Sequence, residues 1–573
     1  MLRVRFITTG LSPFAGLVLV IAMLLPAASA HGQPADAKRP MTFLDMQKMR
    51  QVGSPAPSPD ARLLLYTIST PDWKEARRQT DIYLVSLEKG LASTRQMTFT
   101  KDKNESEPKW LKDNVSFVFA SNREAPASTA TQNQLYLMRI DGGEAKKITE
   151  AKEGVTTFAL SKDGKWLVYR SGKAGEEQLY RVPMDGFDTA TPEALTKQAA
   201  GLAAWRWAPD DKRIYFVGPE AADADEKARR EKKFTVDIRN AETPLASLWA
   251  VDIEPRKITQ LTKDPTITIA DFAVSPDAKW VGFRGISADR YRRNITEQNI
   301  NGDPFLLNAA TGETERLIEN QEVGESTPGF SPDSRFVVFS APDDLAKYSM
   351  KNGRVYMRAV ADKGGKWRKL GAGYDGDVSA DLWSKDAATI YFNDGVRATT
   401  QLLALDVQKD TVRQVTSEKA ALSVARDEDT GVVLITYSDG ATPSTIFAVP
   451  SIEAVGTRAS WKALTDANPQ VRQFALGAQE EFTWTSKDGK TVGGVLVKPV
   501  GYQPGQRYPL IVAIHGGPAG ADVLKFNGGY GAQVYAGAGY MVLQPNYRGS
   551  TNYGEAFKNG IVGNYFPPGS TTS

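Results

Sequence analysis

The chain has 573 residues, too many for one ordinary hydrophobic core, so at least two domains are expected. Apolar residues make up 41% and charged residues 24%, as in globular proteins and unlike disordered ones. The formal charge is +3, from 70 basic and 67 acidic residues, and there is no cysteine; this composition argues against a nucleic-acid partner and excludes disulfides and thiolate metal sites.

The first thirty residues have the pattern of a secretory signal peptide. Arg3 and Arg5 precede an apolar run over residues 14–25, and Ala28-Ser29-Ala30 supplies a small-x-small cleavage site. We therefore predict cleavage after Ala30 and export to the periplasm or the exterior. The alternative is an uncleaved membrane anchor, but the run is short for a span of about 20 residues. No later segment is long and apolar enough to cross a bilayer.

A short helix is predicted within residues 41–52. Thr42 is followed three residues later by Asp45, and at this spacing each side chain can bond the other's backbone N–H where a helix starts.

A repeat fills residues 53–470. Its anchor is a Ser-Pro-Asp-x turn followed by an apolar strand, with the clearest copies starting at Ser58, Ser161, Ser275 and Ser331. Proline presets φ in such a turn, whereas serine and aspartate bond the nearby backbone. The turns recur at intervals of roughly fifty residues, as expected for four-stranded propeller blades.

A second element recurs in step with the turn. Strands such as those at Gln134-Leu135 and Gln401-Leu402 are followed, after a polar turn, by apolar-Thr pairs such as Ile148-Thr149 and Val415-Thr416. Since one blade cannot bury its own faces, the blades should pack in a closed ring. We predict a β-propeller of seven or eight blades, with eight favoured by eight copies of the turn. Within it, the mixed charge cluster at residues 226–233 is expected to be a solvated loop or hairpin.

Residues 471–566 have a different pattern, that of an α/β domain. A hairpin is predicted over residues 482–499, a buried strand over 508–514, then a helix and a second buried strand over 539–545. Residues 567–573, Pro-Gly-rich at their start and rich in serine and threonine, are expected to be a disordered tail. The fold class is therefore a β-propeller followed by an incomplete α/β-hydrolase domain.

Two motifs in this last part resemble the hydrolase domain of the prolyl oligopeptidase family of serine peptidases. They are the strand ending in His515-Gly516-Gly517-Pro518 and the run from Asn546 through Arg548-Gly549-Ser550-Thr551. The resemblance is closest to the acylaminoacyl-peptidase and dipeptidyl-peptidase branches, which implies a propeller that restricts substrates to short peptides. It also implies that the His-Gly-Gly-Pro loop forms part of the oxyanion hole, with the Gly517 amide as a donor.

The residues that would perform the chemistry are missing. A hydrolase of this type needs Gly-x-Ser-x-Gly on a strand-to-helix elbow, and that motif occurs nowhere in the 573 residues. We therefore assign no catalytic serine, aspartate or histidine; His515 ends the oxyanion strand and is not assigned as the base. No metal or cofactor site is predicted either, because no ligand cluster or phosphate loop is visible.

Three hypotheses follow. The first is a peptidase truncated before its catalytic triad by a frameshift, premature stop or assembly break, and inactive as given. The second is an exported propeller binding module or pseudoenzyme, and the third is that a separate chain supplies the missing half. In the chain as given, without the strand that carries the nucleophile, the strand at residues 510–514 should lack a neighbour, leaving an exposed hydrophobic edge.

Overall fold

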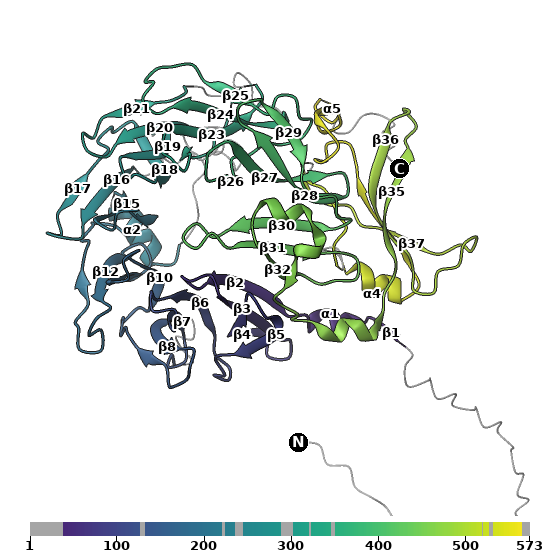
Figure 1. Cartoon of the computed structure of the whole chain (residues 1–573), viewed down its shortest axis with the longest axis horizontal. Helices are drawn as coiled ribbons and strands as arrows, with labels where there is room; N and C mark the ends of the chain where they lie inside the picture. Colours follow the sequence, from purple (N-terminus) through teal and green to yellow (C-terminus); the bar gives the residue numbers. More distant parts are fainter. Residues whose placement is uncertain are drawn as a thin grey trace, which may run out of the picture. The chain divides into compact units, whose positions relative to one another are not determined.

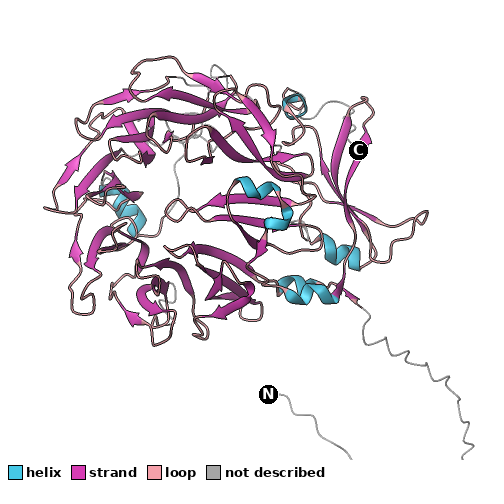
Figure 2. Cartoon of the chain, viewed as in Figure 1, coloured by secondary structure: helices cyan, strands magenta, loops and turns pink. Residues whose placement is uncertain are grey.

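The computed structural model describes residues 38–126, 132–220, 224–234, 245–287, 302–319, 323–344, 350–517, 519–526 and 531–563. The predictions for the signal peptide with its cleavage site at Ala30, for Pro518 and for the tail lie outside these residues. The described residues from Pro40 onward form one compact unit, which begins within the short strand β1 (Arg39–Pro40). Strands dominate this unit and the helices are short (Figure 2).

The N-terminal helix α1 spans Phe43–Gln47, inside the predicted range. Its start has the expected reciprocal bonds: the Asp45 N–H donates to Thr42 Oγ1 at 3.3 Å, and the Thr42 N–H donates to Asp45 Oδ2 at 2.8 Å. These bonds satisfy two backbone donors that a helix start otherwise leaves unpaired.

Eight consecutive four-stranded antiparallel sheets follow, each made of strands adjacent in sequence, so the described residues contain the eight blades that the repeat predicts. The sheets are β2 (Gln51–Pro57), β3 (Leu63–Asp72), β4 (Arg77–Ser86) and β5 (Gly90–Gln96); β6 (Glu105–Trp110), β7 (Ser116–Ser121), β8 (Gln134–Arg139) and β9 (Lys146–Lys147); β10 (Val155–Leu160), β11 (Trp166–Ser171), β12 (Gln178–Pro183) and β13 (Glu193–Ala194); β14 (Trp205–Trp207), β15 (Arg213–Pro219), β16 (Ala246–Asp252) and β17 (Ile258–Gln260); β18 (Ile267–Val274), β19 (Trp280–Ser287), β20 (Gly302–Asn308) and β21 (Thr314–Arg316); β22 (Gly329–Phe330), β23 (Phe336–Pro342), β24 (Gly353–Ala359) and β25 (Arg368–Leu370); β26 (Leu382–Trp383), β27 (Thr389–Val396), β28 (Thr399–Asp406) and β29 (Thr411–Gln414); and β30 (Ala421–Arg426), β31 (Val433–Ser438), β32 (Thr445–Val449) and β33 (Lys462–Ala463).

Apolar packing between neighbouring sheets closes the ring. Each sheet shares a buried cluster with the next, and the last cluster joins Leu64 and Tyr66 of the first sheet to Leu434 and Ile446 of the eighth. In Figure 1 the sheets accordingly follow one another from purple through teal to green, and the eighth lies back beside the first. Because no strand is exchanged between the first and eighth sheets, side-chain contacts alone join them.

The Ser-Pro-Asp-x turn has the same hydrogen bonds in each clear copy. Ser58 Oγ donates to Asp60 at 2.6 Å and accepts the Leu63 N–H at 2.9 Å; Ser161, Ser275, Ser331 and Ser384 make the equivalent pairs of bonds. The fourth turn residue is left-handed, as at Ala61 (φ 55°) and Ala278 (φ 60°). One hydroxyl thus orders the turn and caps the strand that follows.

The second repeated element is explained by one bonding scheme. Thr416 Oγ1 accepts the Leu402 N–H at 2.9 Å and donates to Gln401 Oε1 at 2.7 Å, so the apolar-Thr pair ties its segment to the Gln-Leu strand of the same blade. Thr149 and Thr196 bond their own Gln-Leu pairs in the same way. The N–H of the leucine in each of these Gln-Leu pairs therefore has the threonine hydroxyl as its partner.

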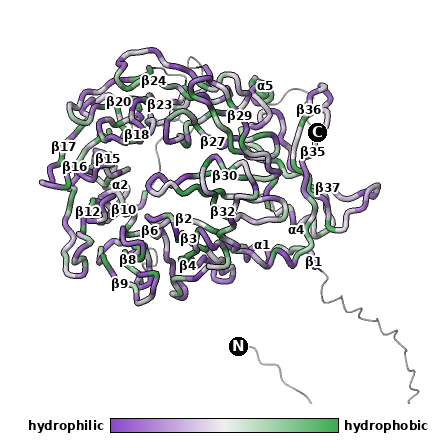
Figure 3. Tube along the Cα trace, viewed as in Figure 1, coloured by the Kyte–Doolittle hydropathy of each residue, from purple (hydrophilic) through white to green (hydrophobic). Residues whose placement is uncertain are grey.

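The charge cluster corrects one prediction. Residues 224–231 form helix α2 (Ala224–Glu231), not a loop or hairpin. The physical reason is composition, because alanine, glutamate, lysine and arginine are all good helix formers. A helix can expose acidic and basic side chains to water as well as a loop can. Figure 3 shows how hydrophobic stretches concentrate along the strands while many connecting loops are hydrophilic.

After the propeller, short elements lead into a ninth sheet with the order β35-β36-β38-β37. The leading elements are the 3-10 turn η4 (Pro469–Gln473) and strand β34 (Phe474–Ala475), whereas the 3-10 turns η2 (Glu453–Gly456) and η3 (Arg458–Ser460) lie within the eighth blade, between β32 and β33. The sheet consists of the predicted hairpin, β35 (Gln479–Thr485) and β36 (Thr491–Val497), then β37 (Leu510–Val512) and β38 (Met541–Asn546), with helix α4 (Ala532–Gly537) between the last two and α5 (Glu555–Asn559) after them.

Strands β37 and β38 are parallel, as the strand-helix-strand pattern requires. Strand β37 is shorter than predicted, and it is not buried as predicted, because it lies at the sheet's edge: Leu510 and Val512 are exposed by 55% and 48%, and Ile514 just beyond the strand by 65%. The expectation of an exposed hydrophobic edge is confirmed for the described residues. Among these same residues, no helix combines the length and apolarity needed to cross a membrane.

Candidate active site

The loop that begins at His515 leaves the carboxyl end of β37. The Ala513 N–H donates to the Leu543 carbonyl at 2.9 Å, which continues the pairing with β38 just beyond the strand itself. His515 is buried, with 8% of its surface exposed, whereas Gly516 and Gly517 are exposed. In parallel α/β sheets, ligands bind at this end of the strands.

The His515 side chain is used within the loop. Its Nδ1 lies 2.8 Å from the Gly516 carbonyl oxygen and its Nε2 lies 3.1 Å from Ser550 Oγ. Because a carbonyl oxygen can only accept, Nδ1 is the donor of the first bond, and Nε2 shares the second bond with the Ser550 hydroxyl, which can donate or accept. Both ring nitrogens therefore support the loop.

Tyr547 supports the same residue from its other side. Its ring stacks on the His515 ring with centroids 4.7 Å apart, and its hydroxyl donates to the His515 carbonyl at 2.9 Å. Ser550 and Tyr547 both belong to the second sequence motif, to which sequence reasoning gave no individual roles. The structure thus joins two motifs that lie more than thirty residues apart.

Gly517 has a backbone conformation that suits glycine. Its φ is 143°, and a Cβ built there would lie 2.9 Å from the Ala519 nitrogen. A side chain would therefore crowd the loop at the position whose N–H the resemblance assigns to the oxyanion.

Ser550 is not placed to act as a nucleophile, although it is bonded to the sole histidine of the described residues. It is completely buried. A serine that attacks a peptide must reach the substrate carbonyl while bonded to its base. The Ser550–His515 bond is accordingly structural.

A second pair of bonds fixes the far end of the loop. The Asp522 N–H donates to Asn546 Oδ1 at 2.7 Å, and Asn546 Nδ2 donates to the Asp522 carbonyl at 2.9 Å. Burial raises the pKa of the Asp522 carboxyl. Asn546 ends β38, so the segment after the glycines is tied to the sheet at both ends.

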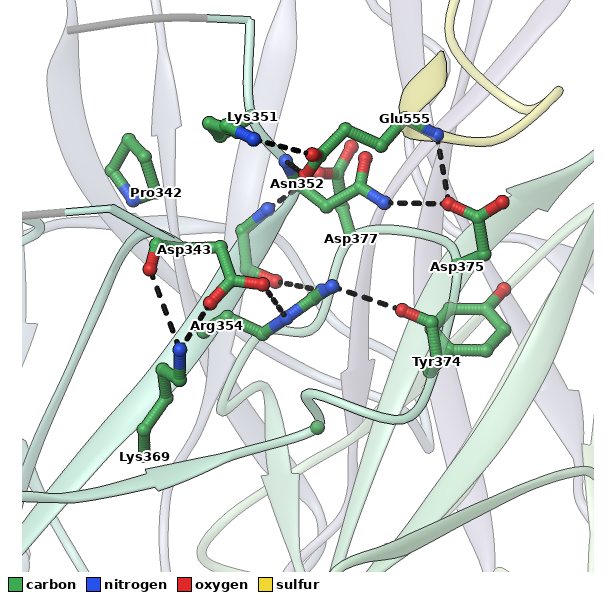
Figure 4. A network of polar contacts seen from close by, with 12 residues as sticks. Pro342, Asp343, Lys351, Asn352, Arg354, Lys369, Tyr374, Asp375, Asp377 and Glu555 are labelled. Atoms are coloured by element: carbon green, nitrogen blue, oxygen red, sulfur yellow. Dashed lines mark hydrogen bonds and ion pairs between the residues drawn. The ribbon is translucent and has the colours of Figure 1, made fainter. Parts of the chain in front are cut away.

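Helix α5 anchors the second motif to the propeller (Figure 4). Glu555 accepts from Lys351 Nζ at 2.8 Å and from the Asn352 N–H at 3.0 Å, while its own N–H donates to Asp375 at 2.7 Å. The buried Lys558 donates to the Lys351 carbonyl at 3.0 Å. These contacts hold α5 between two loops of the sixth blade region.

Arg354 keeps one of those loops in place. Its guanidinium is buried, pairs with Asp343 at 3.1 Å, and donates to the carbonyls of Tyr374 at 3.0 Å and Gly376 at 2.7 Å (Figure 4). A buried arginine is stable only when its donors are satisfied. The loop carrying Asp375 is therefore rigid where α5 docks.

No group of three or more histidine or acidic side chains placed to hold a metal ion occurs in the part of the chain that the structure describes.

Comparisons with known proteins bear on the family. The chain is 23% identical to "Dipeptidyl-peptidase 5" of Porphyromonas gingivalis, covering 97% of this chain and 74% of that protein. It is 24% identical to "Uncharacterized peptidase YuxL" of Bacillus subtilis, covering 92% and 74%. No family model matches the chain.

Solved structures with a similar fold include Pyrococcus horikoshii acylaminoacyl peptidase, with a TM-score of 0.56 at 16% identity over 89% of this chain and 67% of that one. Porphyromonas gingivalis dipeptidyl peptidase 4 has a TM-score of 0.61 at 13% identity over 90% and 74%. The resemblance inferred from the two motifs is thereby confirmed, and it extends through the propeller.

Proposed function

Because this chain is related to the prolyl oligopeptidase family over nearly its whole length, we propose that it is part of a serine-type peptidase that hydrolyses short peptides. The observation that supports this most directly is the loop at Gly517, which follows the carboxyl end of the parallel strand β37. Because Gly517 has no side chain, nothing attached to its own Cα covers its N–H. Tyr547 and Ser550 hold that loop through His515.

The proposed role of Gly517 is to donate its N–H to the oxyanion that forms when a peptide carbonyl is attacked. A donor of this kind contributes roughly 3 to 4 kcal/mol in the transition state, provided that it is fixed before the reaction. The bonds from Tyr547 and Ser550 provide that fixation. The nucleophile and the second donor would come from a Gly-x-Ser-x-Gly elbow.

The restriction to short peptides follows from the propeller's position against the hydrolase part. Helix α5 docks on the sixth blade region, and the Leu524 N–H donates to the Ala398 carbonyl at 2.9 Å in the turn between β27 and β28. Contacts between the propeller and the segment after it support a preference for short, extended substrates over folded proteins. Two of the similar proteins are named for dipeptidyl- and acylaminoacyl-peptidase activity, which agrees with this proposal.

We further propose that these 573 residues do not catalyse hydrolysis by themselves, since they contain no Gly-x-Ser-x-Gly. The experiment compares the 573-residue chain with a longer polypeptide, the extended form, which also carries the residues that the adjoining DNA encodes in any reading frame. The extended form should react with a fluorophosphonate probe and cleave a chromogenic dipeptide, and the 573-residue form should do neither.

The control for the oxyanion role is Gly517→Ala in the extended form. Alanine keeps the N–H, but its Cβ would lie 2.9 Å from the Ala519 nitrogen, so the N–H should be displaced. We expect kcat to fall by up to about 10²- to 10³-fold while reaction with the probe stays measurable. Labelling of the 573-residue chain would contradict the proposal of inactivity. An extended form that carries the elbow but never labels would contradict the peptidase assignment.

Export completes the proposal. The basic, apolar and small-x-small segments before Ala30 support secretion, with the mature chain starting at His31.

A further inference from the structure

The segment that follows β38 connects the glycine loop with the propeller. On one side, Tyr547 and Ser550 bond His515, and the Thr551 N–H donates to the Gly520 carbonyl at 3.1 Å. On the other side, the same segment and helix α5 are bonded to blades six and seven. Whatever holds this segment on the propeller therefore also affects the support of the glycine loop.

Asn552 forms the contact with the seventh blade. The Arg397 N–H donates to the Asn552 carbonyl at 2.9 Å, and Asn552 Nδ2 donates to the Arg397 carbonyl at 3.0 Å. Asn552 also lies against Gly395 of β27, where any Cβ would collide with its amide group. The segment thus packs directly on the strand that carries Asp394.

Helix α5 is held by the loop that connects β25 with β26. The Glu555 N–H donates to Asp375 at 2.7 Å, and Lys558 Nζ lies 3.2 Å from the Asp377 carboxylate (Figure 4). The backbone at Gly554 lies so close to Asp375 that a Cβ there would collide with its carboxylate. Two acids of one loop therefore hold the helix on the propeller.

Asp394 orders this loop, residues 374–377, from its other side. The Tyr374 hydroxyl donates to Asp394 Oδ2 at 2.9 Å, and the Asp377 N–H donates to the same oxygen at 3.2 Å. Between these two bonds, a Cβ at Gly376 would collide with the Asp394 carboxylate. One carboxyl oxygen therefore fixes both ends of the 374–377 loop and, with it, the two acids that bind α5.

The surroundings of Asp394 do not favour its ionised form. Within the described residues it has no lysine or arginine as an ion-pair partner, although Lys558 pairs with Asp377 and Arg354 pairs with Asp343. The charged and titratable groups on the elements that contact Asp394 or its neighbours are Tyr374, Asp375, Asp377 and Asp381 of the β25–β26 connection, Arg354 of β24, Lys351 of the β23–β24 loop, Arg397 after β27 with its partner Glu481, and Glu555 and Lys558 of α5.

Protonation of Asp394 is therefore coupled to docking. Burial raises the pKa of Asp394 from 3.8 to about 6, and the charge of Asp377 contributes. Release of α5 would free the 374–377 loop to move away and let water reach the carboxyl, which would restore its ordinary pKa. The advantage of the docked form is then complete below 3.8 and lost as pH rises through 6. The docking equilibrium can change by at most about 10²-fold, since each unit between the two pKa values is a factor of ten.

We propose that Asp394 and the 374–377 loop form a pH-sensitive latch, which keeps α5 and the segment from Tyr547 docked while Asp394 is protonated and releases them when it is ionised. The glycine loop, which this segment supports, would then be held more firmly in mildly acidic surroundings than at neutral pH. The effect on peptide hydrolysis rests on the proposed function, whereas the latch itself does not.

The test measures amide hydrogen exchange of the 573-residue chain at pH 4.5 and 7.5, with each rate corrected for intrinsic exchange. Protection of peptides that cover residues 547–559 and 513–522 should be lower at pH 7.5 by about five-fold or more, while blades one to five keep theirs. Asp394→Asn retains an oxygen that accepts both bonds but cannot ionise. This variant should show the same protection at pH 7.5 as at pH 4.5.

Two further variants serve as controls. Glu555→Gln weakens the pairing with Lys351 and should lower protection of residues 547–559 at both pH values, which shows that these peptides report docking. Asp429→Asn removes an exposed acid of the eighth blade that makes no ion pair in the described residues, and it should leave the pH dependence unchanged.

Three results would overturn the latch. They are equal protection of residues 547–559 at both pH values in the unmodified chain, an unchanged pH dependence in Asp394→Asn, and a loss of protection spread evenly over all eight blades. In the last case Asp394 would act on overall stability alone. None of these measurements requires hydrolysis or fluorophosphonate labelling, so a failure of the latch and a failure of the proposed peptidase function are observed separately.

Discussion

Replacing Tyr547 by phenylalanine isolates one hydrogen bond of the glycine loop. The variant keeps the ring that stacks on His515 at 4.7 Å and loses the hydroxyl that donates to the His515 carbonyl at 2.9 Å. A neutral hydrogen bond contributes about 0.5 to 1.5 kcal/mol net, and a carbonyl left unpaired in a buried place can cost more. We therefore expect the loop to become less stable by about 1 kcal/mol.

Amide hydrogen exchange reports this loss directly. A change of about 1 kcal/mol in local opening corresponds to roughly five-fold faster exchange, and it should be confined to peptides that cover residues 513–522. Tyr547→Ala should accelerate exchange further, because the ring contact is lost as well. Tyr540→Phe is the matched control, since that tyrosine is exposed and its hydroxyl has no bond in the described structure. Unchanged exchange in Tyr547→Phe, or equal acceleration throughout the propeller, would refute the proposed support.

Three other predictions concern stability and processing. Burial raises the pKa of Asp394 from 3.8 to about 6, aided by the charge of Asp377. The folded chain therefore holds this proton more tightly than the unfolded chain, and the stability that the proton provides is lost as pH rises through 6. The free energy of unfolding of Asp394→Asn, measured in urea, should thus exceed that of the unmodified chain by up to about 3 kcal/mol at pH 8 but not at pH 3.5. The same difference at both pH values would contradict the raised pKa of Asp394. Because the apolar edge at β37 is exposed, limited proteolysis should cut the chain after Pro469 well before it cuts the propeller. Equal resistance on both sides of Pro469 would contradict the prediction that the part after it is less stably folded. Intact mass of the secreted chain should show His31 as its first residue, and retention of residues 1–30 would argue for the anchor instead.

Much of the propeller could be predicted because its signals are local. The bonds that shape each turn join residues two to five positions apart, as between Ser58, Asp60 and Leu63. The number of copies of this turn also favoured eight blades over seven, and the structure has eight. The ring closure was only implied, since the contacts of Tyr66 with the eighth blade link the two ends of the repeat.

The site could be predicted only in part, for the opposite reason. Gly517 was found through its motif, but the partners that hold its loop lie far along the chain. Ser550 is 35 residues from His515, and Glu555 is 204 residues from Lys351. No local pattern distinguishes such a glutamate or serine from an ordinary surface residue, so these contacts required the folded structure.

The exposed edge of β37 connects stability with chemistry. Its outer edge has no partner strand in the described residues, and the alternating side chains of Leu510, Val512 and, just beyond the strand, Ile514 are about half exposed or more. Covering each would stabilise the chain by up to roughly 1.5 to 3 kcal/mol, while leaving them open favours aggregation. The Gly517 loop needs a nucleophile and a second donor at the end of this same strand. A strand that adds to β37 and ends in the serine elbow would meet both needs at once. The extension that restores fluorophosphonate labelling should therefore also raise the unfolding free energy of the hydrolase part. Labelling restored without any gain in stability would contradict the proposal that the added strand pairs with β37.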